Sequence, residues 1–352
     1  MVTYLLGAGA SAKSIPVTSG LLDSMWTFIK VLESYQNDPM SKLSLKYDNI
    51  VIDPKDHHAG LYYGGMLLLT DASKHQTIDT YAKMLFFTDQ TQKLQQLKVF
   101  LSCYFYWVQT LLTPDDRYDH FFASVLEKSD SIMPLAPIIP GKVKILTWNY
   151  DSQFELCFSR YIDPTQSYYE IKNKANICTK FDPFSESTFS VLKINGSSQI
   201  YNINNEQVFP LPDYSLYKVD KKYGIRDAIL IYSLLNNAIQ YKFQTMISFA
   251  WENNISDLNH SPSSGVFKSL ENTETLVVIG YSFPFFNRKI DEFILFQMPQ
   301  LRRIFLQSKD ATVLSGLKSR LHSMLFGHMN SKLRSNIELI DDTSQFFIPY
   351  EL

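Results

Sequence analysis

The sequence is poor in cysteine. Only three of its 352 residues are cysteines, Cys103, Cys157 and Cys178, and none of them forms a CxxC pair. Three scattered thiols can build neither a disulfide framework nor a four-thiolate zinc site. We therefore expect a reducing compartment and no bound zinc, and we find no convincing metal spacing among the histidines and carboxylates.

A basic excess and a long hydrophobic run are also missing. Lys and Arg number 33 and Asp and Glu 35, which gives a net charge of −2. Proteins that neutralise many phosphates normally carry a basic excess, so direct binding of nucleic acid is not expected. The most apolar stretch, residues 99–112, is shorter than the roughly 20 residues of a membrane span. Without a basic leader at the N-terminus either, the sequence predicts a soluble, cytoplasmic protein.

Hydrophobic residues make up 45% of the chain, which is ample for a buried core. Several short apolar runs are typical of strands, and each ends in small or polar residues. Long or helical segments separate them, which predicts an α/β fold with a Rossmann-like parallel sheet. The predicted strands are Val2–Leu6, Val143–Thr147, Ser190–Ile194, Thr275–Ile279 and Arg303–Leu306.

Two long segments interrupt this core. Residues 20–135 contain two helical patterns, one with Thr18 or Ser19 as its predicted cap and one with apolar positions from Leu94 to Leu111. Residues 200–270 contain a third, over 227–249. We therefore predict a core formed by residues 1–19, 136–199 and 271–352, a helical insertion at 20–135 and a second insertion of unknown role at 200–270.

Small residues follow the first predicted strand. The turn Gly7-Ala8-Gly9-Ala10-Ser11 suits a pyrophosphate, because its amide groups lie at the start of a helix, but a tight strand-to-helix turn explains it equally well. Ala12 occupies the place of a third glycine, and no acidic residue follows at the end of a second strand. These differences disfavour an ordinary NAD-dependent dehydrogenase.

Four motifs in order resemble the SIR2-like, sirtuin-related family. Gly7–Ser11 with Pro16 matches the family's GAGxS and GIP pieces, Thr147–Asp151 matches TxN(Y/I)D, Asn195-Gly196 stands at HG, and Gly280–Ser282 matches G(T/Y)S. The resemblance spans residues 5 to about 308 and implies a SIR2-type Rossmann core that binds NAD. Neither insertion is matched by it.

The resemblance assigns roles position by position. Gly7, Ala8, Gly9, Ala10 and Ser11 would line the NAD pyrophosphate with Pro16 close by. Asn149 would hold the nicotinamide ribose, and Asp151 would lie near the carboxamide. Gly280 and Ser282, and on weaker grounds Ser308, would contact the adenosine side.

Two departures from the family narrow the function. The four-cysteine zinc module of the protein deacylases is absent, so the sequence looks like the bacterial antiphage branch, which hydrolyses NAD. Asn195 replaces the family's HG histidine, a general base, and an amide cannot accept a proton. Asp151 or an inserted histidine such as His120 would have to replace it, although a helix-end histidine with a single hydrogen bond is the more ordinary interpretation of His120.

The sequence therefore predicts an NAD+ glycohydrolase that acts by NAD depletion in antiphage defence. The alternative is a catalytically silent subunit that binds NAD or ADP-ribose. By resemblance we expect a homo-oligomer with a separate sensor or ATPase partner, of the HerA or Argonaute type, because the chain has little room for a sensor domain. The aromatic runs 104–107 and 283–286 favour either a subunit contact or a fully buried helix, and Asn287 and Asp291 are spaced to share a helix face near the site.

Overall fold

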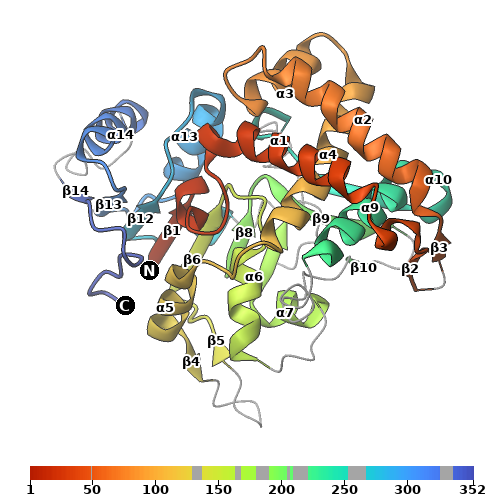
Figure 1. Cartoon of the computed structure of the whole chain (residues 1–352). Helices are drawn as coiled ribbons and strands as arrows, with labels where there is room; N and C mark the ends of the chain where they lie inside the picture. The colour runs from red at the N-terminus through yellow and green to blue at the C-terminus, as the bar shows by residue number, and fades with distance from the viewer. Residues whose placement is uncertain are drawn as a thin grey trace.

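A parallel sheet forms the centre of the molecule in the computed structural model (Figure 1), which describes residues 1–48, 50–128, 137–162, 168–179, 190–203, 207–208, 221–252, 267–325 and 336–352. Within these residues the sheet has seven strands in the order β14-β13-β12-β1-β6-β8-β7, and every neighbouring pair is parallel. The predicted α/β class is confirmed. The strands are β1 (Val2–Leu6), β6 (Val143–Thr147), β7 (Ile177–Thr179), β8 (Val191–Lys193), β12 (Thr275–Ile279), β13 (Arg303–Gln307) and β14 (Ile337–Ile340).

The first strand lies in the middle of this sheet. After β1 the chain builds β6, β7 and β8 on one side, and later β12, β13 and β14 on the other. Such a reversal of strand order leaves a switch point, here between β1 and β12, where ligands bind in open α/β sheets. Residues of β1, β6 and β12 are all buried, which explains why their sequences are mainly apolar.

Helices cover both faces of the sheet. The helices α5 (Asp116–Val125), α6 (Gln153–Phe158) and α7 (Tyr168–Lys174) pack on the face that carries Tyr4 and Ile145. The helices α13 (Arg288–Phe296) and α14 (Ala311–Met324) cover the opposite face, around Leu5 and Leu276. The sheet therefore lies between two separate hydrophobic cores, one on each face.

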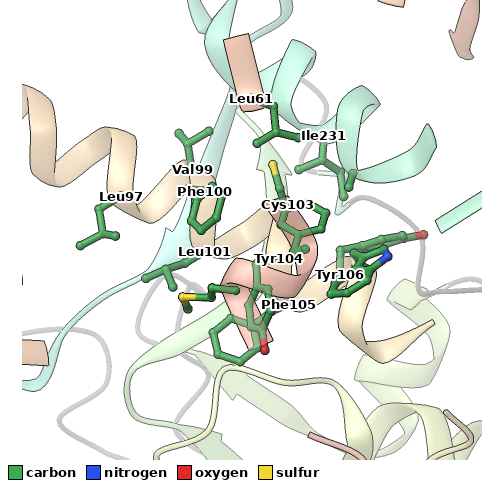
Figure 2. Close-up of a cluster of buried hydrophobic side chains, with 14 of the residues drawn as sticks. Leu61, Leu97, Val99, Phe100, Leu101, Cys103, Tyr104, Phe105, Tyr106 and Ile231 are labelled. Carbon is green, nitrogen blue, oxygen red and sulfur yellow. The ribbon is translucent and has the colours of Figure 1, made fainter. Parts of the chain in front are cut away.

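A third core belongs to a helical layer, which lies beyond the carboxyl end of β1 (Figure 1). It contains α1 (Thr18–Tyr35), α2 (Pro54–Ala72), α3 (Ile78–Phe87), α4 (Thr91–Gln109) and α9 (Lys222–Asn236). Figure 2 shows Leu61 of α2 and Ile231 of α9 beside the α4 side chains. Residues 104–107 of α4 are buried in this core, so the first aromatic run is part of a buried helix. Phe285, in the second run, is exposed.

The second insertion differs from its prediction. The helix predicted over residues 227–249 is wrong beyond Tyr241. Helix α9 ends at Asn236, and the short α10 (Ala238–Tyr241) is capped by Lys242, a left-handed residue with φ of 60°. A strand follows, β11 (Phe243–Ile247), which pairs antiparallel with β9 (Gly196–Asn202), as does β10 (Gln207–Val208). Residues of both predicted insertions share the helical core. Within the segment 200–270, residues 204–206, 209–220 and 253–266 lie outside the described residues.

Smaller elements complete the chain. Two antiparallel hairpins join β2 (Leu45–Tyr47) to β3 (Ile50–Ile52), and β4 (Glu127–Lys128) to β5 (Pro137–Ile138). The N-cap of α1 is Val17, so the predicted caps Thr18 and Ser19 lie inside the helix. None of the helices in the described ranges is long and apolar enough to cross a membrane.

Candidate functional site

The turn after β1 is packed directly against the turn after β12. The Gly7 N–H donates to Ile279 O (3.0 Å), and the Gly9 N–H donates to Gly280 O (2.9 Å). A Cβ atom at Gly9 would lie 2.6 Å from the Gly280 Cα, and Gly280 itself has φ of +59°. The close approach of the two strand ends is therefore enough to explain why both positions are glycine. These amide groups, predicted to face a pyrophosphate, are engaged within the protein.

An ion pair that sequence reasoning missed holds the carbonyl groups of this turn. Arg117 Nη2 donates to Gly9 O (3.0 Å) and Ala10 O (3.1 Å). Asp115 accepts from Arg117 Nε (2.9 Å) and Nη2 (2.6 Å), and from the Lys13 N–H (3.1 Å). Arg117 is 6% exposed and Asp115 1%. The buried Arg117 guanidinium therefore fixes the 3₁₀ turn η1 (Ala8–Ser11) by binding its backbone carbonyl groups.

Asn149 and Ser11 meet where β6 and β1 end. Asn149 Nδ2 donates to Gly7 O (3.0 Å) and lies 3.3 Å from Ser11 Oγ. The Tyr118 hydroxyl, from α5, lies 3.1 Å from the same Ser11 oxygen. All three side chains are buried. The ends of β1 and β6 are thereby joined through side chains and not only through sheet hydrogen bonds.

Asp151 lies in the same cluster. Its carboxylate accepts from the Gln153 N–H (3.1 Å) and interacts with Ser11. Burial raises the pKa of Asp151 above its usual range, and the charge of Lys193 acts in the opposite direction. Lys193 Nζ donates to the Asp151 backbone oxygen (2.7 Å) and to Glu155 Oε1 (2.6 Å). This buried ion pair supports the turn that carries Asn149 and Asp151.

Asn195 lies at the end of β8, beside the β6 turn. Its Nδ2 donates to Trp148 O (3.3 Å), and its backbone oxygen accepts from the Ser248 N–H (2.8 Å). The Trp148 ring is stacked on Tyr281, with ring centroids 5.8 Å apart. Asn195 Oδ1 is buried without a hydrogen-bond partner among the described residues. A ligand hydroxyl at this position would satisfy it.

Tyr281 connects the end of β12 to α13. Its hydroxyl donates to both carboxylate oxygens of Asp291 (3.0 and 2.9 Å) and accepts from Asn287 Nδ2 (2.9 Å). Asn287 and Asp291 therefore both bind the Tyr281 hydroxyl, in agreement with the helix face that their spacing predicts. Burial raises the pKa of Asp291 well above its usual range.

The remaining predicted site residues lie further out. Pro16 is half-buried before α1, and Ser282 is exposed, with its carbonyl oxygen accepting from Arg320. Ser308 follows β13, where its N–H donates to Ile340 O (3.1 Å). None of these three has a contact among the described residues that links it to Asn149.

The inserted histidines do not replace the missing base within the described residues. His120 is exposed on α5, near Ser124. His58 Nε2 lies 2.7 Å from Leu32 O, inside the helical layer. His260 and His328 are outside the described residues.

No group of three His, Cys, Asp or Glu side chains that could hold a metal ion occurs within the described part of the chain. Comparison of the sequence with known protein families and with curated proteins finds no match in either.

Proposed function

We propose that this protein is a SIR2-like NAD+ glycohydrolase, which cleaves NAD+ to nicotinamide and ADP-ribose without zinc. One observation carries the proposal. Ser11 of one motif and Asn149 and Asp151 of another converge in one buried cluster at the carboxyl ends of β1 and β6, beside the switch point between β1 and β12. This is the edge of an α/β sheet at which dinucleotides bind.

The cluster suits cleavage of a glycosidic bond to a good leaving group. When the C1′–N bond breaks, its electron pair goes to the nicotinamide nitrogen, and positive charge develops on the ribose. A carboxylate at Asp151 would stabilise that charge, while Asn149 would hold the ribose hydroxyls. Water then bonds to C1′ and releases one proton.

The family resemblance supports a role in antiphage defence by NAD depletion, in a homo-oligomer with a separate sensor or ATPase partner of the HerA or Argonaute type. Unregulated hydrolysis of NAD would kill the host, so gating by a partner is physically sensible. The exposed aromatic ring of Phe285, which is 79% exposed, is suited to a subunit contact.

The test is release of nicotinamide and ADP-ribose from NAD+, measured chromatographically on the pure full-length protein. We expect Asn149→Ala to abolish release. Asn336→Ala is the matched control, because Asn336 also donates to a backbone carbonyl, Arg302 O, but at an exposed position between strands. Activity that survives in Asn149→Ala would contradict the proposed site.

A second candidate is a catalytically silent subunit that binds NAD or ADP-ribose. The amide of Asn195 favours it, because this side chain cannot accept a proton. Binding would then raise the melting temperature without release of nicotinamide. If Asn195→His creates activity that the natural sequence lacks, the silent subunit is the better description.

A further inference from the structure

A cavity separate from the candidate site lies between three helices of the helical layer. Helices α1, α4 and α9 contact one another there (Figure 1), and the cavity has a volume of about 220 Å³. Drug-sized ligands occupy pockets of roughly 300–1,000 Å³, so this space suits a smaller molecule of one or two rings. Most of its described lining is apolar and consists of Val31, Tyr35, Trp107, Leu111 and Ile225.

The buried end of the cavity is aromatic and held in place by packing. Tyr35 and Trp107 are 5% and 3% exposed, and the Trp107 ring lies 4.8 Å from that of Phe28. Val31 and Tyr35 are four residues apart on α1, a spacing that places both side chains on the same face of the helix. A planar ring that enters this space therefore meets aromatic and branched side chains whose positions are already fixed.

Charged side chains lie at the more exposed end of the cavity. They are Asp38, which follows α1, and Lys221 and Lys222 at the start of α9. Lys222 Nζ lies 2.6 Å from Asp38 Oδ2 and holds the pKa of that carboxyl below its usual range, so the two charges offset each other. Lys221 is exposed and has no ion-pair partner among the described residues. The described lining therefore carries one positive charge in excess.

The backbone of α9 acts in the same direction. This helix begins beside the two lysines and has no acidic residue in its first turn. The start of a helix carries a partial positive charge, which favours an anion nearby. The exposed end of the cavity therefore suits a negatively charged group.

The cavity and the candidate site lie on different sides of α4. Trp107 lines the cavity, and Gln109, two residues later, is rotated by about 200° around the helix. Gln109 Oε1 accepts from the Ser152 N–H (2.6 Å), next to Asp151. The described lining shares no residue with the cluster of Ser11, Asn149 and Asp151. A ligand in the cavity is therefore distinct from the NAD+ of the proposed function.

We propose that this cavity binds a small aromatic anion, with the ring against Tyr35 and Trp107 and the acidic group beside Lys221. The ring loses apolar surface to side chains that need not move, and the anion stays at the exposed end, where water still reaches it. The inference does not depend on the proposed function, because none of the described lining residues takes part in NAD+ cleavage.

The test is isothermal titration calorimetry of the full-length protein with naphthalene-1-acetate and with naphthalene-1-acetamide, which lacks the charge. We expect the acetate to bind with a Kd of roughly 0.1–1 mM, the range for a ligand of this size, and about 3- to 5-fold more tightly than the amide. Lys221→Met should remove that difference and leave the Kd of the amide unchanged. Asp38→Asn, which removes the acidic group of the lining, should tighten binding of the acetate alone. Lys289→Met, at an exposed lysine of α13, is the control.

A second variant checks where the compounds bind. Ser34 is exposed on α1 and lines the cavity, so Ser34→Trp should fill the space and prevent binding of both compounds. Ser319→Trp is the matched control, because Ser319 is also exposed and its hydroxyl also donates to a carbonyl of its own helix, but on α14. Circular dichroism shows whether each variant is folded.

Each contrary outcome overturns the proposal. If neither compound binds at millimolar concentration, the cavity is not a site for this class of ligand. Equal Kd values for the acetate and the amide, or an acetate Kd that Lys221→Met leaves unchanged, would refute the recognition of an anion. Binding that survives in folded Ser34→Trp would place the compounds elsewhere. None of these results bears on release of nicotinamide from NAD+, so the proposed function stands or fails separately.

Discussion

Lys193 Nζ lies 2.6 Å from Glu155 Oε1, and the two side chains are 2% and 0% exposed. Lys193 also donates to the Asp151 backbone oxygen, so a strand residue, a helix residue and the candidate-site turn share one buried charge. Burying two charges is costly unless both are satisfied. The contact therefore makes the position of Asp151 depend on a fully buried ion pair.

Removing one member of this pair should be strongly destabilising. We expect Lys193→Met to cost about 3–5 kcal/mol, because it leaves the Glu155 carboxylate buried and unpaired. The double variant Lys193→Met/Glu155→Leu should recover most of that loss. Urea unfolding checks both, with Lys13→Met as control, since its pair with Asp116 is also 2.6 Å long but is exposed. Equal losses in Lys193→Met and Lys13→Met would contradict the argument.

Replacing Arg117, which binds the glycine turn, should destabilise the protein even when the new residue is the similar lysine. Arg117→Lys keeps the charge but cannot bind Asp115, Gly9 O and Ala10 O together. We expect a loss of about 2 kcal/mol in the free energy of unfolding, together with weaker thermal stabilisation by NAD+. Arg303→Lys, at an exposed pair with Glu351, should change neither measurement.

We expect substitution of the glycines at the switch point to destabilise the protein, because an added side chain would clash. A Cβ at Gly9 would meet the Gly280 backbone at 2.6 Å, so Gly9→Ala should cost about 2–3 kcal/mol or more. Gly64→Ala, in an exposed part of α2 with no atom within 4 Å of the added Cβ, should stabilise by about 0.5–1 kcal/mol. Chemical denaturation of both variants would show opposite signs, and equal effects would refute the close contact.

Asp79 should leave a signature in the pH dependence of stability. Its pKa is raised to about 6 in the folded protein and is about 4 in the unfolded chain, so the folded state binds more protons between these values. Stability is therefore lost as the pH rises from about 4 to about 6. Since the residue is partly exposed, we expect about 1–2 kcal/mol.

Asp79→Asn should recover that loss above pH 6 and give little below pH 4, apart from a few tenths of a kcal/mol for the lost charge at the start of α3. Urea midpoints at pH 5.0 and 7.5 test this. Parallel pH profiles for the natural protein and the variant would disprove the raised pKa of Asp79.

Much of the sheet could be predicted because its central strands are buried on both faces. Val2–Leu6 and Thr275–Ile279 are apolar apart from one threonine each, and a glycine follows each strand. By contrast, β7 and β14 have only three and four residues, too few for a pattern. The sequence predicts helix over β11, because its apolar residues continue the series that begins in α9.

A residue of the candidate site could be predicted only where it belongs to a local sequence motif. Ser11 and Asn149 follow strands whose ends must meet in a parallel sheet. Arg117 comes from the helical insertion, and its position depends on long-range packing that no local pattern encodes. Lys193 did leave a signal, since a single lysine inside a buried strand needs a partner, and Glu155 stands equally alone in an apolar helix.

The central place of β1 affects how the chain is synthesised. Its neighbours in the sheet, β6 and β12, are made about 140 and 270 residues later. A nascent chain therefore carries the first strand without a neighbour until β6 is made, and with one open edge until β12 is made. Since Gly9 bonds to Gly280, the candidate site is completed only after residue 280 has left the ribosome, and no shorter nascent chain contains it.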